Sequence, residues 1–305
     1  MAGDPGLFGP RSVTWQMHGD PMMWIAGVRA LYLQALHPRA VAGVMQNSAA
    51  FQRNTRGRRD AWGRLMRTAH FVGTITYGTT AAAERAGAGV RGLHRRLSAA
   101  DTATGERFRI DDPELLLWVH CAEVASYLHV LRRSGFPLTD AQADAYLDEQ
   151  RTGARLVGLD PDGVPGDRAA YAAYFAAVRP RLALTGGARQ VDAFLRRPPT
   201  PAPLVPARAL VWHRVAGLAY GALPSYAHEL YGRPAPRPAT VTRRLRATGR
   251  ILRAIPPSVR WRLPPRHILR AVERLGPDTR PAPYKLRRAA AILDGGEGPR
   301  GEPYH

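Results

Sequence analysis

Glycine and proline divide this chain into segments whose apolar residues recur at helical spacing, and this pattern constrains the fold more than any other feature. The clearest segment opens with Asp112-Pro113-Glu114, a capping residue followed by a proline in the first turn. It continues as a strongly apolar helix from Leu115 to Leu131. The sequence has no internal repeat and no convincing alternation of apolar and polar residues of the kind that forms strands. We therefore predict an all-α fold.

Other segments predict helices through the same signals of capping, periodicity and termination. Asp20-Pro21 is expected to begin a helix that ends at His37-Pro38, and Thr139 to begin another with a capped first turn. The β-branched run from Phe71 to Tyr77 is ambiguous. The remaining predicted helices lie within Val41–Met45, Asp60–Ala69, Thr80–Leu97, Tyr171–Val178, Ala207–Leu223, Pro224–Tyr231, Val241–Leu252 and Ile268–Leu275.

The length of 305 residues allows a sizeable core without disulfides or structural metal. We predict a single large helical domain, with a core over residues 8–232 and basic helices over residues 233–293 packed on that core. Residues 155–167, rich in glycine and proline, predict a loop, and residues 198–203 predict a stiff polyproline II connector. Residues 294–305 are expected to form a flexible tail.

Positive charge dominates the chain, with 44 Lys and Arg against 24 Asp and Glu. Lys285 is the only lysine, and the excess is concentrated between residues 233 and 300, where sixteen arginines and Lys285 face four acidic residues. Such a segment attracts phosphate, an anionic membrane surface or an acidic partner. It lacks the interleaved aromatic residues of a single-strand binder and any DNA-reading motif, so no specific nucleic-acid partner is expected.

Several classes of protein are excluded or disfavoured by what the sequence lacks. Cys121 is the only cysteine, which excludes a disulfide framework and a zinc site built on several thiolates. The first residues lack the basic start and apolar run of a signal peptide, so we expect a cytoplasmic protein. Walker, dinucleotide-binding, zinc-protease and nucleophile-elbow motifs are missing as well. The candidates for chemistry are therefore histidines on apolar helix faces.

His94 and His120 are the two histidines that the helical pattern places among apolar residues. Val90, Leu93 and Leu97 surround His94 at helical spacing, and His120 has neighbours of the same kind. An imidazole on a helix that faces an apolar cavity can hold haem iron from one side. A core histidine bonded to a carbonyl is the more common result of such a pattern, so spacing alone leaves both interpretations open.

Two further groups of residues give weaker evidence of a functional role. His37 precedes Pro38 at a helix end, where its ring could satisfy free carbonyls, and this favours a structural role over catalysis. Arg64, Arg67 and Thr68 share one side of a helix at positions i, i+3 and i+4. Together they could bind a haem propionate, polarise dioxygen or hold an anionic substrate, and a solvated arginine face is the alternative.

Longer motifs along nearly the whole chain resemble one family. They are "MHGDP" (17–21), "RALYLQALHPRAVAGVMQNS" (29–48), "WGRLMRT" (62–68), "TYGTT" (76–80), "VRGLHRRL" (90–97), "DDPELLLWVH" (111–120) and "ELYG" (229–232). In this order they are similar to the bacterial family of mpaB-type oxygenases, which includes the catalytic domain of the latex-clearing rubber oxygenases. The resemblance implies an all-α, globin-like haem b protein that cleaves isoprenoid C=C bonds with dioxygen.

The resemblance also implies roles for particular residues. In these proteins a histidine within a Val-Arg-x-x-His helix holds the haem iron with dioxygen bound opposite, and His94 matches that histidine, although Ser98 stands where relatives have a basic residue. An Arg-x-x-Lys-Thr element of the relatives corresponds to Arg64, Arg67 and Thr68. Arg67 replaces the lysine, and because a guanidinium is a poor iron ligand, it is expected to donate a hydrogen bond instead.

Two functions from different classes follow, and His120 and His37 remain alternative iron ligands in the first. The first is a haem b-dependent oxidoreductase, an oxygenase that uses dioxygen and an electron donor on a small, apolar, isoprenoid-like substrate. The second is a non-enzymatic helical protein that binds anionic lipid or nucleic acid through residues 233–300. Haem sensing or storage without turnover is a third and lesser function. The first function requires bound haem and the second does not, so a test for haem distinguishes them.

Overall fold

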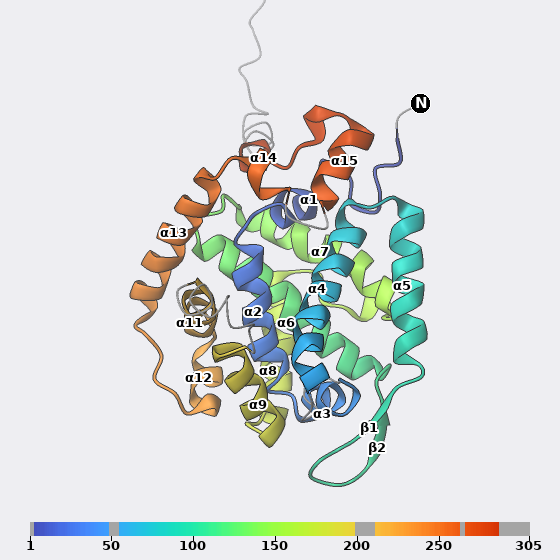
Figure 1. Cartoon of the computed structure of the whole chain (residues 1–305), viewed down its shortest axis with the longest axis vertical. Coiled ribbons are helices and arrows are strands. Elements are labelled where there is room, and N and C mark those ends of the chain that lie inside the picture. The colour runs from blue at the N-terminus through green and yellow to red at the C-terminus, as the bar shows by residue number, and fades with distance from the viewer. Residues whose placement is uncertain (1–2, 49–54, 199–210, 263–265, 287–305) are drawn as a thin grey trace, which may run out of the picture.

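Two long helices, α2 (Met23–Gln34) and α6 (Pro113–Arg133), lie against each other at the centre of the computed structural model (Figure 1). The structure describes residues 3–48, 55–198, 211–262 and 266–286, without the side chains of residues 55–62 and 64. Within these residues the predicted all-α fold is confirmed, and the globin-like arrangement stays a prediction. The other helices are α1 (Val13–His18), α3 (Pro38–Asn47), α4 (Thr55–Tyr77), α5 (Thr80–His94), α7 (Asp140–Val157), α8 (Arg168–Val178), α9 (Gly186–Arg196), α11 (His213–Gly221), α12 (Ser225–Tyr231), α13 (Pro238–Ala254), α14 (Pro257–Arg260) and α15 (His267–Leu275), with short 3₁₀ turns at Pro161–Gly163, Arg179–Arg181 and Pro277–Thr279.

Helix starts follow the capping signals of the sequence. The Asp112 side chain accepts a hydrogen bond from the Glu114 N–H at the start of α6. Thr139 and Gln142 form a complete capping box at the start of α7, which satisfies two backbone groups that the first turn leaves without partners. Gly158 ends α7 at φ 104°, in the left-handed region that favours glycine. The helices predicted at these positions are confirmed.

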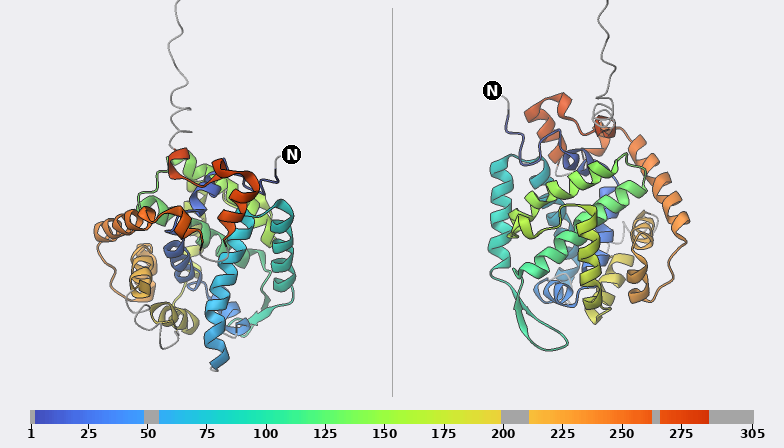
Figure 2. Two further views of the ribbon diagram at one scale, coloured as in Figure 1. Left: turned by 45° about the horizontal axis from the view of Figure 1, so that its top comes forward. Right: turned by 180° about the vertical axis from the view of Figure 1, so that it is seen from behind.

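The core forms where α2 and α6 meet α7, α9, α11 and α13. Trp118 of α6, Tyr32 of α2 and Tyr146 of α7 are among its largest fully buried side chains. Burying one large apolar side chain contributes about 1.5–3 kcal/mol to folding, so α6, which is buried along most of its length, anchors the domain. Figure 2 shows the same central pair enclosed by helices from the other two directions.

Helix α4 is longer than the sequence predicts. It begins at Thr55, so Asp60 does not cap it, and it continues through the ambiguous run Phe71–Tyr77 up to Gly78. The β-branched residues of that run are weak helix formers, but this part of α4 packs against α1, α5 and α15. These tertiary contacts outweigh a small unfavourable propensity.

Asp20 does not cap the helix that follows it. The N-cap of α2 is Met22, without a side-chain cap bond, and Asp20 accepts a hydrogen bond from the Met22 N–H. The carboxylate also pairs with Arg253 of α13 at 2.6 Å. The predicted helix is confirmed, but its expected cap is instead a buried ion pair that joins the N-terminal region to the C-terminal helices.

Other differences between the predicted and the observed secondary structure involve short elements. Ser98–Ala100 (β1) and Arg107–Arg109 (β2) pair as an antiparallel hairpin, with Ala99 opposite Phe108. The expectation that strands are absent is therefore wrong here, because two three-residue strands are too short to show an alternating pattern. The sequence also does not predict α1, α9 and α14. Residues 199–203 of the polyproline segment, residues 207–210 and the tail at 294–305 lie outside the described residues.

The sequence predicts that Leu93 lies on an apolar, buried face of α5. This prediction is wrong, because the Leu93 side chain is 55% exposed. The buried residues of α5 are Ala83 and Gly87. Gly87 lies where a Cβ would meet the Leu156 carbonyl oxygen at 2.7 Å, so α5 approaches α7 through its small residues rather than through its large apolar ones.

The C-terminal helices contact the rest of the chain through specific polar and apolar contacts. α13 packs on α6 and α11 and buries Val241 and Leu245. α15 packs on α4, and a Cβ at Gly73 would lie 2.2 Å from the His267 ring, so only glycine allows this close approach. Among the described residues, no helix is both long enough and apolar enough to cross a membrane.

Candidate functional site

Three polar residues of α6 follow one another along the strongly apolar helix: His120, Glu123 and Tyr127. Their spacing of three and four residues places them on the same face of the helix. Large polar groups in the most deeply buried helix of a domain cost stability unless they are satisfied or serve a purpose. This stripe is the candidate functional site.

His120 presents a shielded ring nitrogen. Its Nε2 atom is buried and has no hydrogen-bond partner among the described residues. Burial lowers the pKa of His120 to about 4, so the imidazole is neutral at pH 7. A neutral imidazole with an unused nitrogen is the form that ligates a metal, and a ligand would relieve the cost of leaving that nitrogen unsatisfied.

Glu123 is a partly buried carboxyl next to His120 on the helix face. Its Oε1 atom accepts a hydrogen bond of 2.8 Å from the Tyr127 hydroxyl. Burial raises the pKa of Glu123, and the same burial, followed by the Glu123 charge, raises the pKa of Tyr127. Glu123 is thus shifted toward its protonated form, which suits a group that holds or passes on a proton.

His18 extends the polar network toward α4 and α7. Its Nδ1 lies 2.8 Å from Thr76 Oγ1, and its Nε2 lies 3.2 Å from the Tyr146 hydroxyl. Thr76 donates its own proton to the Val72 carbonyl, so it accepts from His18 Nδ1–H. Burial lowers the pKa of His18 to about 3, and the neutral ring therefore accepts the Tyr146 proton at Nε2.

His94 is the last residue of α5, on a different helix from His120. Its Nδ1 is buried, and the ring lies close enough to Asp111 to lower the pKa of that carboxyl slightly, after the larger effect of Arg109. His94 and His120 thus both have a shielded ring nitrogen. Each fits a group held by a histidine, and the preference for His94 stays a prediction.

The predicted Arg64, Arg67 and Thr68 group lies on α4. Arg67 and Thr68 are exposed and each interacts with another group of the chain, and the Arg64 side chain lies outside the described residues. Their shared side of the helix follows from spacing, and their role toward an anionic group stays a prediction.

His37 is buried and acts as the N-cap of α3. Its Nδ1 accepts a hydrogen bond of 3.4 Å from the Ala40 N–H, and its ring packs on Trp118. The expectation that it satisfies carbonyls at the end of the preceding helix is wrong, because the ring turns forward to the next helix. Its nitrogen is used in this cap, which agrees with a structural role.

Cys121 lies beside His120 but is a poor candidate for a ligand. It is buried, and burial raises its pKa to about 12, so the thiol keeps its proton.

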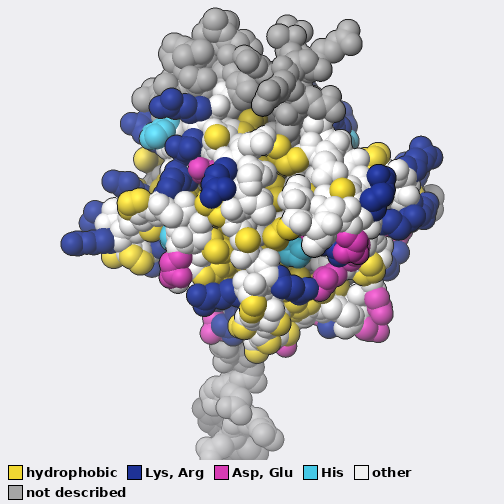
Figure 3. Space-filling view, turned by 90° about the horizontal axis from the view of Figure 1, so that it is seen from below, with side chains coloured by type: hydrophobic (Ala, Val, Ile, Leu, Met, Phe, Trp, Pro, Cys, Tyr) yellow, Lys and Arg dark blue, Asp and Glu magenta, His cyan; other side chains and the backbone are white. Residues whose placement is uncertain are grey.

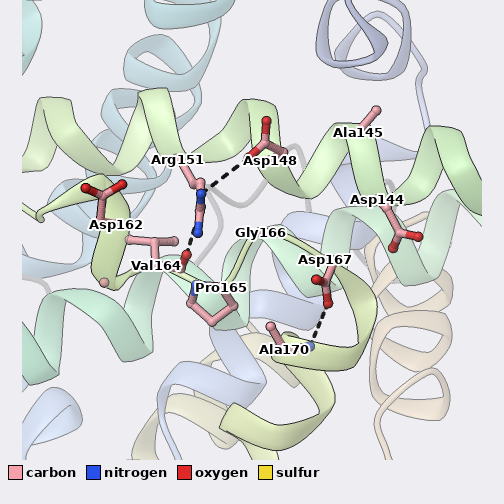
Figure 4. A pocket seen from close by; sticks show the side chains of 11 residues that line it. Asp144, Ala145, Asp148, Arg151, Asp162, Val164, Pro165, Gly166, Asp167 and Ala170 are labelled. Atoms are coloured by element: carbon pink, nitrogen blue, oxygen red, sulfur yellow. Dashed lines mark hydrogen bonds and ion pairs between the residues drawn. The ribbon is translucent and has the colours of Figure 1, made fainter.

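Two hollows lie away from these histidines. The larger, of about 570 Å³, lies beside α7 and is lined by four aspartates and Arg151, which pairs with Asp148 and donates to the Val164 carbonyl (Figure 4). The second, of about 370 Å³, is lined by His129, three arginines and apolar side chains. Neither contains His94 or His120. No cluster of three or more His, Cys, Asp or Glu residues suited to a metal ion occurs in the described part of the chain.

The sequence analysis missed Glu123, Tyr127 and His18. The signal for Glu123 was its spacing of three residues from His120 within the strongly apolar helix α6. His18 stands in the "MHGDP" motif, but no local pattern indicates that it bonds to residues of α4 and α7.

A comparison with protein families identifies the class of this helical domain as the catalytic domain of an oxygenase. The family model described as "ER-bound oxygenase mpaB/B'/Rubber oxygenase, catalytic domain" matches residues 15–254. The chain belongs to this family, which confirms the resemblance seen in the motifs. Searches among curated proteins and among solved structures found no match.

Proposed function

We propose that this protein is a haem b-dependent oxygenase that acts on a small, apolar, isoprenoid-like substrate with dioxygen. Membership of an oxygenase catalytic-domain family supports the class of reaction. The observation that carries the haem proposal is the buried, unpartnered Nε2 of His120, with the partly buried carboxyl of Glu123 on the same helix face. A cytoplasmic location and an electron donor belong to the same proposal.

Histidine is the residue that would hold the iron. His94 is the first candidate because of the family motif, and His120 is the second because its neutral ring has a nitrogen to offer. When bound, haem supplies the redox chemistry with dioxygen, and the protein supplies ligand choice, pocket shape and polarity.

The other residues would handle charge and protons. Arg67 can donate hydrogen bonds to an anionic haem substituent or to oxygen, with Thr68 beside it. Glu123 can hold a proton at its carboxyl oxygens, and Tyr127 restrains that carboxyl through its hydrogen bond. The neutral His18 ring and Tyr146 complete a buried network that keeps this side of α6 in one arrangement.

The first test is the visible absorption spectrum of protein made with an adequate supply of haem. Four samples are compared: wild type, His94→Ala, His120→Ala and His213→Ala, the last a control because His213 is exposed on α11. We expect a Soret band in the wild type and the control. We expect loss or shift of this band in the variant that lacks the proximal ligand.

Each outcome separates the alternatives. A band changed only in His94→Ala assigns that residue, and one changed only in His120→Ala moves the ligand to α6. No Soret band in the wild type, even after haem is added, refutes the proposal and leaves the non-enzymatic binding protein as the better function. Oxygen consumption with isoprenoid substrates then distinguishes an oxygenase from a haem sensor or store.

A further inference from the structure

The segment from Arg233 to Arg262 has an unusual charge composition, with nine arginines and no Asp or Glu. Two of these arginines face inward and form ion pairs. Arg233 lies 2.7 Å from Asp192, and Arg253 lies 2.6 Å from Asp20. These pairs fix α13 to the domain, so the outward face of the helix is held in place before any partner binds.

The outward face of α13 is strongly basic. Arg243, Arg244, Arg246 and Arg250 are all exposed, and none forms an ion pair with another described residue. The opposite face of the helix buries Val241 and Leu245. Other parts of the surface differ: on the face seen in Figure 3, arginines are mixed with acidic and hydrophobic side chains.

Exposed aliphatic side chains adjoin this basic face at the end of α13 and in α14. Ile251 is 67% exposed, Ile255 is 38% exposed and Val259 is 58% exposed. Single exposed aliphatic residues are common, but three within nine residues beside a run of arginines form an amphipathic surface.

We propose that this surface, formed by Arg243, Arg244, Arg246, Arg250, Ile251, Ile255 and Val259, docks the protein on an anionic lipid bilayer. The arginines would lie among the lipid phosphates, and the three aliphatic side chains would enter the boundary between headgroups and acyl chains. A nucleic acid would satisfy the arginines but leave these aliphatic side chains in water. The surface also has no exposed aromatic ring on which bases could stack, since Trp261 is buried.

The location of the surface keeps α5, the helix that ends at His94, away from a docked bilayer. α13 and α5 lie on opposite sides of the molecule in the front and back views (Figures 1 and 2). Contact with a bilayer through α13 therefore leaves the α5 side free. The proposal does not depend on haem.

The test is flotation of the full chain with vesicles of phosphatidylcholine alone or with about a third phosphatidylglycerol. The charge variant is R243Q/R246Q/R250Q, and the apolar variant is I251S/I255S/V259S. The matched control, R85Q/R189Q/R197Q, removes three exposed arginines, one from α5, one from α9 and one directly after α9, and changes the net charge equally. Circular dichroism of each variant checks that it is folded.

We expect binding to the anionic vesicles only, and its loss at high salt. Each arginine near an anionic surface contributes about 1 kcal/mol, so the charge variant should bind on the order of a hundredfold more weakly. The apolar variant should also bind more weakly, and the control should bind like the wild type. Three results would each overturn the proposal: no flotation of the wild type, equal loss in the control, or tight binding to duplex DNA that the apolar variant does not affect.

Discussion

Replacing His18 tests the buried polar network through the pH dependence of stability. His18 bonds to Thr76 and Tyr146 inside the domain, and burial lowers its pKa to about 3, against an ordinary value of 6.5. In the unfolded chain the ring takes up a proton below pH 6.5, whereas in the folded protein it stays neutral until about pH 3. The stability that His18 contributes is therefore complete above pH 6.5 and falls as the pH is lowered.

The size of this effect follows from the difference in pKa. Each pH unit between the two pKa values costs about 1.36 kcal/mol, so lowering the pH from 6.5 to 5 removes about 2 kcal/mol of stability through His18 alone. His18→Gln cannot titrate in this range. The difference in the free energy of unfolding between wild type and variant should thus shrink by about 2 kcal/mol between pH 7 and pH 5.

Urea unfolding followed by circular dichroism at pH 7, 6, 5.5 and 5 measures this difference. His213→Gln is the control, because it replaces a histidine at an exposed position. Glu123 acts in the opposite direction, but it is present in both proteins and its effect cancels in the subtraction. A difference for His18→Gln that does not change with pH would refute the assignment of His18 as a buried, neutral histidine.

Three other perturbations follow from the structure. Asp20→Asn leaves Arg253 without its carboxylate at a site where the Asp20 side chain is 2% exposed; it should cost about 3–5 kcal/mol in urea unfolding. The double variant Asp20→Asn/Arg253→Met should recover part of the lost stability. If the effects of the two substitutions simply add, Asp20 and Arg253 are not directly coupled. Gly73→Ala should cost about 1–3 kcal/mol by thermal or urea unfolding, because its Cβ would meet the His267 ring, and the cost should fall in a His267→Ala background. An equal cost in both backgrounds would contradict the close approach of α15 to α4. Glu123 contributes a loss of stability as the pH rises above 4.5, and in Glu123→Gln this contribution should disappear, since an amide does not ionise. Melting temperatures of wild type and variant at pH 5 and pH 8 measure the difference, and an unchanged pH dependence would mean that the Glu123 carboxyl is not shifted by burial.

The candidate site was only partly predictable from the sequence. His120 stood out because a histidine in the strongly apolar α6 breaks an otherwise regular pattern, and His94 was singled out by a motif shared with the family. Leu93, assigned to the apolar stripe around His94, is exposed, because periodicity shows that two residues share a face but not which face another helix covers.

Local interactions explain what the sequence determined by itself. Caps such as Asp112 and the Thr139 box, the helical period of α6 and the glycine at the end of α7 act between residues a few positions apart, so the all-α class and most helices could be predicted. The arginine excess and the family motifs are also properties of the sequence alone.

Tertiary structure decided how distant residues meet. Asp20 reaches Arg253 across 233 positions, and His18 reaches Tyr146 across 128, and no local pattern encodes either contact. The burial that makes His18 and His120 neutral and raises the pKa of Glu123 likewise arises only when the helices pack against one another. The sequence supplied the chemical groups, and packing set their protonation, because the cost of a charge depends on the whole surrounding fold.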